Sequence, residues 1–65
     1  MNYFIKTSEG KYRTTAGNFV YPKDLRIDEH FQYFSSRNEC DQFIKKSGII
    51  RAESWGMAAH KTFAE

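Results

Sequence analysis

A single cysteine, Cys40, is the sequence feature that most limits how this chain can fold. One cysteine excludes an internal disulfide, and no Cys-x-x-Cys or His-x-x-x-His spacing suggests a structural zinc ion. Below about 70 residues a hydrophobic core rarely stabilises a domain by more than a few kcal/mol, and small natural domains often add such cross-links. The core of these 65 residues must therefore come from side chains, chiefly from six Phe, four Tyr and one Trp.

The composition is typical of a soluble globular domain, with 40% apolar and 28% charged residues. No apolar run approaches the roughly 20 residues that a membrane helix needs. The first six residues lack the charged lead and apolar stretch of a secretion signal. A lone free thiol is typical of a reducing compartment. We expect one cytoplasmic domain over residues 1–65, with no membrane contact.

Residues 1–22 predict a three-strand meander. β-Forming residues alternate with turn signals at Gly10 and at Gly17-Asn18, where positive φ is tolerated. Pro22 removes a backbone donor, so it ends the third strand or lies on an edge. The predicted strands cover residues 2–7, 11–15 and 19–21.

The clearest local signal is a capping box, in which Ser36 caps a helix and Glu39 reaches back. The helix is predicted over residues 37–46, and Gly48 is the expected stop. Apolar residues at helical spacing give it one buried stripe. That stripe consists of Cys40, Phe43 and Ile44.

The remaining segments complete a small sheet. Residues 23–29 form a connection with two apolar anchors, Leu25 and Ile27. Two further strands are predicted over residues 30–34 and 49–54, the latter ended by Gly56. For residues 57–65 a short helix and a flexible tail both remain open.

These elements predict an α+β fold, in which a small antiparallel sheet (the meander plus one or two further strands) packs against one amphipathic helix. Alternation along the strands places aromatic side chains on both faces of the sheet. One short helix covers only part of one face. We therefore expect aromatic surface to remain outside, unless the tail or a second subunit covers it.

Two groups of residues are candidates for binding. Lys6, Lys11, Tyr12 and Arg13 interleave bases with an aromatic ring on the first hairpin, a pattern that can stack nucleic-acid bases and contact phosphates. The alternative is a solvated hairpin, and the small net charge of +2 favours it. Trp55 either closes the open end of the core or contacts a partner.

No catalytic or metal-binding residues are predicted. Cys40 lies in the first turn of a helix, which would activate a thiol paired with His30 or His60, but its place on the apolar stripe favours a core role. The run Asp28-Glu29-His30 is interpreted as a solvated acidic loop, because adjacent strand residues point to opposite faces. We expect no cofactor and no enzymatic activity.

The chain resembles small uncharacterised bacteriophage accessory proteins. The resemblance rests on Tyr3-Phe4-Ile5-Lys6-Thr7 leading into Glu9-Gly10-Lys11-Tyr12, and on Phe34-Ser35-Ser36-Arg37-Asn38-Glu39-Cys40 leading into Phe43-Ile44. Cys40 stands where the family usually has alanine. The resemblance implies an accessory protein that binds and modulates a host component, and it carries over no catalytic residues.

Three hypotheses follow. The leading one is a non-enzymatic module that inhibits or modulates a host protein by docking on it with exposed aromatic residues. The alternative is a small nucleic-acid-binding domain that uses the first hairpin. A homodimer is the third. The residues expected at a binding surface are Lys6, Lys11, Tyr12, Arg13 and Trp55.

Overall fold

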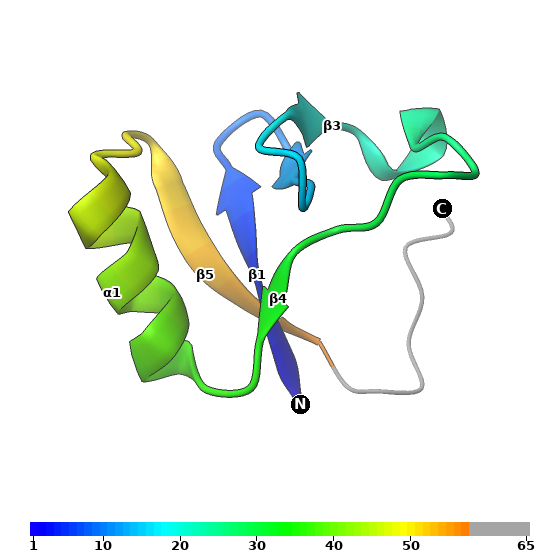
Figure 1. Ribbon diagram of the computed structural model, residues 1–65. Helices are drawn as coiled ribbons and strands as arrows, with labels where there is room; N and C mark the ends of the chain where they lie inside the picture. Colours follow the sequence, from blue (N-terminus) through cyan, green and yellow to red (C-terminus); the bar gives the residue numbers. More distant parts are fainter. Residues whose placement is uncertain (58–65) are drawn as a thin grey trace.

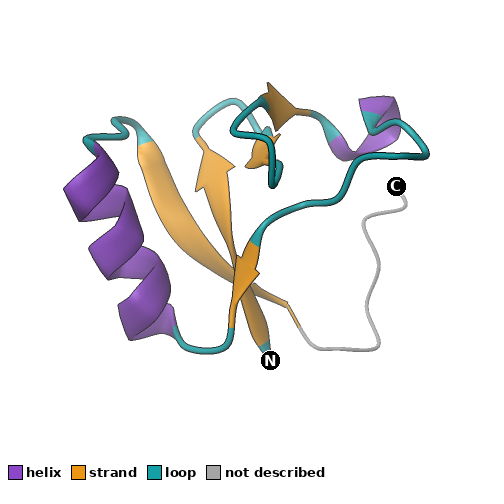
Figure 2. Ribbon diagram, in the orientation of Figure 1, coloured by secondary structure: helices purple, strands orange, loops and turns teal. Residues whose placement is uncertain are grey.

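A computed structural model describes residues 1–57 of the chain. Within these residues an antiparallel sheet of five short strands packs with one α-helix, so the predicted α+β fold is confirmed. Figure 1 shows α1 along one side of the sheet, and Figure 2 shows the same view by element type. The elements are β1 (Asn2–Thr7), β2 (Tyr12–Arg13), β3 (Phe19–Val20), the 3₁₀ turn η1 (Pro22–Asp24), β4 (Tyr33–Phe34), α1 (Arg37–Ser47) and β5 (Ala52–Met57).

β1 is the central strand of the sheet. It pairs with β5 along all of its six residues, so β2 and β4 share its other edge at opposite ends. β3 lies beyond β2, and a single bridge between Thr14 and Phe31 joins the end of β2 to the segment before β4. The sheet therefore depends on one strand for most of its pairing.

The predicted turns are confirmed. Gly10 and Gly17 both have φ of 91°, the left-handed region that glycine enters at no steric cost. The Gly10 N–H donates to the carbonyl of Thr7 at 3.0 Å, which closes the first hairpin. Pro22 does not continue β3 and instead begins η1, where its fixed φ suits the first turn.

The helix boundaries follow from two capping motifs. At the start, the Ser36 hydroxyl accepts a hydrogen bond from the Glu39 N–H at 3.2 Å. The Glu39 carboxylate in turn accepts from the hydroxyl of Ser35. At the end, Gly48 adopts φ of 71°, and the Ile49 N–H donates to the Ile44 carbonyl at 3.3 Å. This is a Schellman motif, and it leaves α1 one residue longer than predicted.

The two faces of the sheet carry separate clusters. On the helix-covered face, Ile5 and Cys40 are completely buried, and the rings of Phe34 and Phe43 lie 5.4 Å apart. On the opposite face, three aromatic side chains form a buried cluster that partly buried residues cover. That cluster consists of Phe4, Tyr12 and Phe31, with Val20, Leu25 and Met57 packed against it.

Several sequence predictions for the chain after β3 are wrong, and the strand predicted over residues 30–34 covers only Tyr33–Phe34. Ile27 was expected to anchor the connection, but its side chain is fully exposed, because the turn from Pro22 onward directs only Leu25 onto the cluster. The fifth strand begins at Ala52, not at residue 49, since the Schellman motif holds Ile49 and Arg51 has a positive φ of 56°. The expectations for residues 58–65 lie outside the described residues.

Gly56 was expected to end the fifth strand, but β5 continues through it. Gly56 pairs with Tyr3 of β1, and a Cβ atom at Gly56 would lie 2.8 Å from Cε2 of the Tyr3 ring. The Met1 sulfur would lie equally close, at 2.8 Å. Glycine therefore fits here because the Tyr3 ring and the Met1 side chain approach the backbone closely, and it does not break the strand.

Candidate binding surface on the aromatic face

Three aromatic residues form a row across three adjacent strands. Phe4 of β1 pairs with Tyr33 of β4 on one side and with Trp55 of β5 on the other. Residues paired across antiparallel strands share a face, so these three side chains lie side by side on the face opposite α1. Phe4 is 8% exposed, whereas Tyr33 is 61% and Trp55 40% exposed. A buried ring thus separates two exposed ones.

A second row lies next to the first. Lys6, two residues after Phe4 on β1 and therefore on the same face, pairs with Tyr12 of β2 and with Glu53 of β5. The Lys6 ammonium lies 3.8 Å from the centre of the Trp55 ring and 6.0 Å from that of Tyr12. We call the surface formed by Phe4, Lys6, Tyr33, Glu53 and Trp55 the aromatic face.

The electrostatic character of the aromatic face is nearly balanced. Lys6 and Glu53 are cross-strand partners of opposite charge, which is a stabilising arrangement in a sheet. The ammonium of Lys6 also favours the electron-rich face of the indole ring. The surface therefore offers large aromatic area with one cation and one anion at fixed positions.

The structure divides the five predicted binding residues. Lys6 and Trp55 lie together on the aromatic face, and Tyr12 shares that face but is only 7% exposed. Burial raises the pKa of the Tyr12 hydroxyl above its usual 10.0. Tyr12 therefore belongs to the buried cluster that packs beside this surface, and a partner could reach little of its side chain.

Arg13 and Lys11 lie elsewhere. Arg13 points to the helix side, where its Nη1 donates to Gln32 Oε1 at 2.6 Å and its guanidinium lies 5.1 Å from the Phe43 ring. The Lys11 ammonium lies 3.6 Å from the Glu9 carboxylate. The hairpin does not bring these two bases beside Lys6.

Tyr33 is the exposed aromatic residue of this surface that, like Phe4 and Glu53, was not among the predicted binding residues. Its alternation with Phe31 already placed both on one face, which was the available signal. What was missing was the register between β4 and β1, which brings Tyr33 beside Phe4. Two-residue strands such as β4 give no pattern from which a register can be deduced.

Cys40 takes the core role. Its side chain is completely buried, and burial, reinforced by the nearby charge of Asp41, raises the pKa of the thiol from 9.0 to about 11. Arg37 opposes this shift only partly. The thiol is protonated at neutral pH, which does not suit a nucleophile.

The acidic loop is held by local contacts. The Glu29 carboxylate accepts from the Arg26 N–H at 3.1 Å and lies 3.9 Å from the Arg26 Nε. The His30 carbonyl accepts from the Thr15 N–H. Within residues 1–57, no three of the His, Cys, Asp and Glu side chains are grouped so that they could hold a metal ion.

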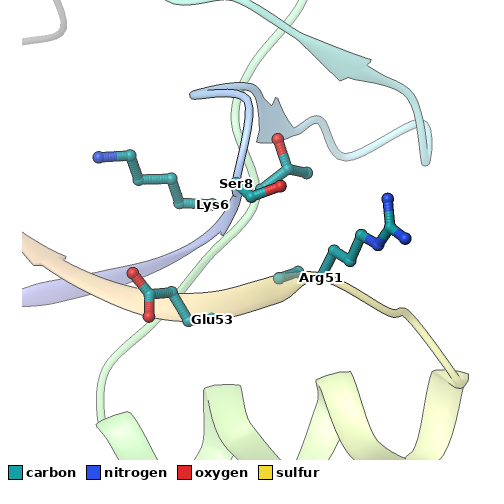
Figure 3. A pocket seen from close by; sticks show the side chains of 6 residues that line it. Lys6, Ser8, Arg51 and Glu53 are labelled. Carbon is teal, nitrogen blue, oxygen red and sulfur yellow. The ribbon is translucent and has the colours of Figure 1, made fainter.

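A shallow cavity of about 290 Å³ lies beside the aromatic face, between the end of β1 and the start of β5. Figure 3 shows that the side chains of Lys6 and Arg51 leave it in opposite directions. Because the two cations do not converge, the cavity does not form an anion site. Its lining residues are Lys6, Thr7, Ser8, Arg51, Ala52 and Glu53.

Comparison of the chain with protein-family models, with curated proteins and with solved structures returned no match. In the described part of the chain, no helix is long and apolar enough to cross a membrane.

Proposed function

We propose that this protein is a small, non-enzymatic binding module that docks on another protein through its aromatic face. The observation that supports this most is the row in which exposed Tyr33 and Trp55 flank buried Phe4. Trp and Tyr are enriched among the residues that contribute most to protein interfaces. Two such rings, on the two strands that flank β1, suit an apolar patch of a partner.

The exposed rings are held before any partner arrives. Tyr33 packs against Phe4 with 6.1 Å between ring centres, and Trp55 lies under the Lys6 ammonium. Side chains that are already ordered lose less conformational freedom on binding. The paired charges of Lys6 and Glu53 at the rim would orient the partner.

The identity of the partner is proposed from the resemblance described above. A phage accessory protein of this kind would dock on a host protein in the bacterial cytoplasm and act by occlusion. No reacting group is required for that mechanism, because a bound module blocks the surface that it covers.

The proposal is tested by comparing variants in a binding experiment. Immobilised wild-type protein and the double variant Tyr33→Ala/Trp55→Ala are exposed to bacterial lysate, and retained proteins are quantified by mass spectrometry. A specific partner should be retained by the wild type and lost by the double variant. Ile27→Ala is the matched control, since Ile27 is fully exposed but lies outside the aromatic face. Equal retention by wild type and double variant would overturn the proposal.

Nucleic-acid binding is the second candidate, favoured by the contact between Lys6 and Trp55. Aromatic rings with a neighbouring cation can stack single-stranded bases while the cation contacts phosphate. The pairing of Glu53 with Lys6 and of Glu9 with Lys11 weakens this candidate. It requires affinity for single-stranded oligonucleotides that falls steeply with salt and is lost in Lys6→Glu.

A further inference from the structure

β5 is an edge strand with an unusual composition. It pairs with β1 over six residues, and no other strand in residues 1–57 pairs with it. Natural edge strands commonly carry lysine, proline or a bulge that prevents pairing with another chain. The sequence Ala-Glu-Ser-Trp-Gly-Met contains neither lysine nor proline. Only Glu53 adds a charge to this edge.

The hydrogen-bond pattern shows which backbone groups of β5 face outward. The Ser8 N–H donates to the Arg51 carbonyl at 3.0 Å, which continues the ladder between β1 and β5. In an antiparallel pair, residues bond to the neighbouring strand at every second position. Residues 53, 55 and 57 therefore bond to β1. The outward backbone groups belong to Ala52, Ser54 and Gly56.

We propose that two copies of this chain pair through β5, antiparallel, about a two-fold axis at Ser54. In this register Ser54 lies opposite Ser54 of the second copy, and Ala52 lies opposite Gly56. The outward backbone groups of all three residues in both copies are then used. Their side chains are small, which allows the two backbones to approach at the normal strand spacing.

Charge favours this register over its neighbours. With the axis at Ser54, Glu53 lies opposite Trp55 of the second copy, whose ring already carries the Lys6 ammonium at 3.8 Å. Each Glu53 thus gains a cation across the interface. An axis at Glu53 would place two carboxylates opposite each other, and an axis at Trp55 would bring the two Lys6 ammonium groups together.

The inference does not depend on the proposed partner, because the two copies pair through outward backbone groups of β5, although Glu53 and Trp55 also belong to the aromatic face. A two-fold axis perpendicular to the sheet leaves both aromatic faces on the same side. The dimer would therefore present two copies of the row Tyr33–Phe4–Trp55 on one continuous surface.

Sedimentation equilibrium from low micromolar to near-millimolar concentration tests the proposal. The mass should rise from 7.7 kDa toward twice that value. Glu53→Lys should weaken association roughly tenfold, because the two-fold axis repeats each unfavourable pair. The charge swap Lys6→Glu/Glu53→Lys should restore it. Glu9→Lys makes the same change in net charge at the hairpin tip and should have no effect.

Amide hydrogen exchange provides the second measurement. The Ser54 amide should become protected as concentration rises, while the Trp55 amide, bonded to β1, should be protected throughout. A mass of one chain at the highest concentration would overturn the proposal. So would a Ser54 amide already protected at the lowest concentration, because another segment of the same chain would then occupy the edge.

Discussion

The two faces of the sheet are covered by different elements and bury different side chains. On the face covered by α1, small and aliphatic groups such as Ile5 and Cys40 are completely buried. On the other face, the chain from β3 to β4 lies on the side away from α1 and covers a cluster of aromatic rings (Figure 1). A regular helix covers its face more completely than an irregular loop does.

That difference explains where the candidate binding surface lies. The loop brings Leu25 onto Phe4, Tyr12 and Phe31, but it leaves Tyr33 and Trp55 largely uncovered. Large rings can stabilise a core with one edge while presenting the other to solvent. Under the proposed function, the aromatic face would therefore contribute both to folding and to recognition.

The largest effect is expected on the helix face. Ile5→Ala should lower the free energy of unfolding by about 2 to 5 kcal/mol, because the side chain is completely buried in the central strand. Urea unfolding followed by circular dichroism measures this. Ile27→Ala, at a fully exposed position, should change stability by less than about 0.5 kcal/mol. Similar losses in both variants would contradict the described core.

Alkaline pH should also act first on the helix face. The thiol of Cys40 has a folded-state pKa of about 11 against an ordinary 9.0, so the folded state holds its proton more tightly than the unfolded state does. The associated stability is complete below pH 9 and should be lost by pH 11, by about 2 to 3 kcal/mol.

Cys40→Ala is the matched variant for the alkaline loss. It should be less stable at neutral pH but should lose less stability between pH 9 and 11. Some loss should remain above pH 10, because burial also raises the pKa of Tyr12 on the aromatic face. Identical alkaline profiles for wild type and Cys40→Ala would contradict the assignment of this effect to Cys40.

A smaller effect is expected where β5 crosses Tyr3. Gly56→Ala should cost about 1 to 3 kcal/mol, since the new methyl group would overlap the Tyr3 ring. In a Tyr3→Ala background the same substitution should cost less, because the remaining close group, the Met1 sulfur at 2.8 Å, is the end of a flexible side chain that can move away. Denaturant unfolding of the four proteins in this double-mutant cycle measures the coupling. Additive effects would show that the ring is not what requires glycine.

The smallest effect on stability is expected on the aromatic face. Tyr33→Ala should change the free energy of unfolding by less than about 1 kcal/mol, because the side chain is 61% exposed. Its affinity for the partner should nevertheless fall roughly tenfold or more. Titration of the captured partner, together with thermal unfolding, separates the two quantities. A stability loss as large as that of Ile5→Ala would remove the distinction between the faces.

Local signals in the sequence predicted local structure well. Ser36 and Gly48 bound the helix as expected, because each cap depends on contacts within a few residues. The first strand was predicted with its observed bounds for the same reason. The ends of these elements are determined by residues that are close to them in the sequence.

Features that depend on residues far apart in the sequence could not be predicted in this way. The start of β5 depends on how many residues the end of α1 uses, and Ile49 is held there by a bond to Ile44. The candidate surface depends on register, which brings Tyr33 of β4 and Trp55 of β5 to the same residue, Phe4. No pattern within either segment contains that information.

The pairing of β1 with β5 has a consequence for synthesis. The central strand leaves the ribosome before the other described elements, but the strand that borders its whole length follows only after all of them. Until then the apolar run Tyr3-Phe4-Ile5 has no complete edge to bury against. We expect this domain to fold late and in one step, and the run Tyr3-Phe4-Ile5 to be the segment that chaperones contact until then.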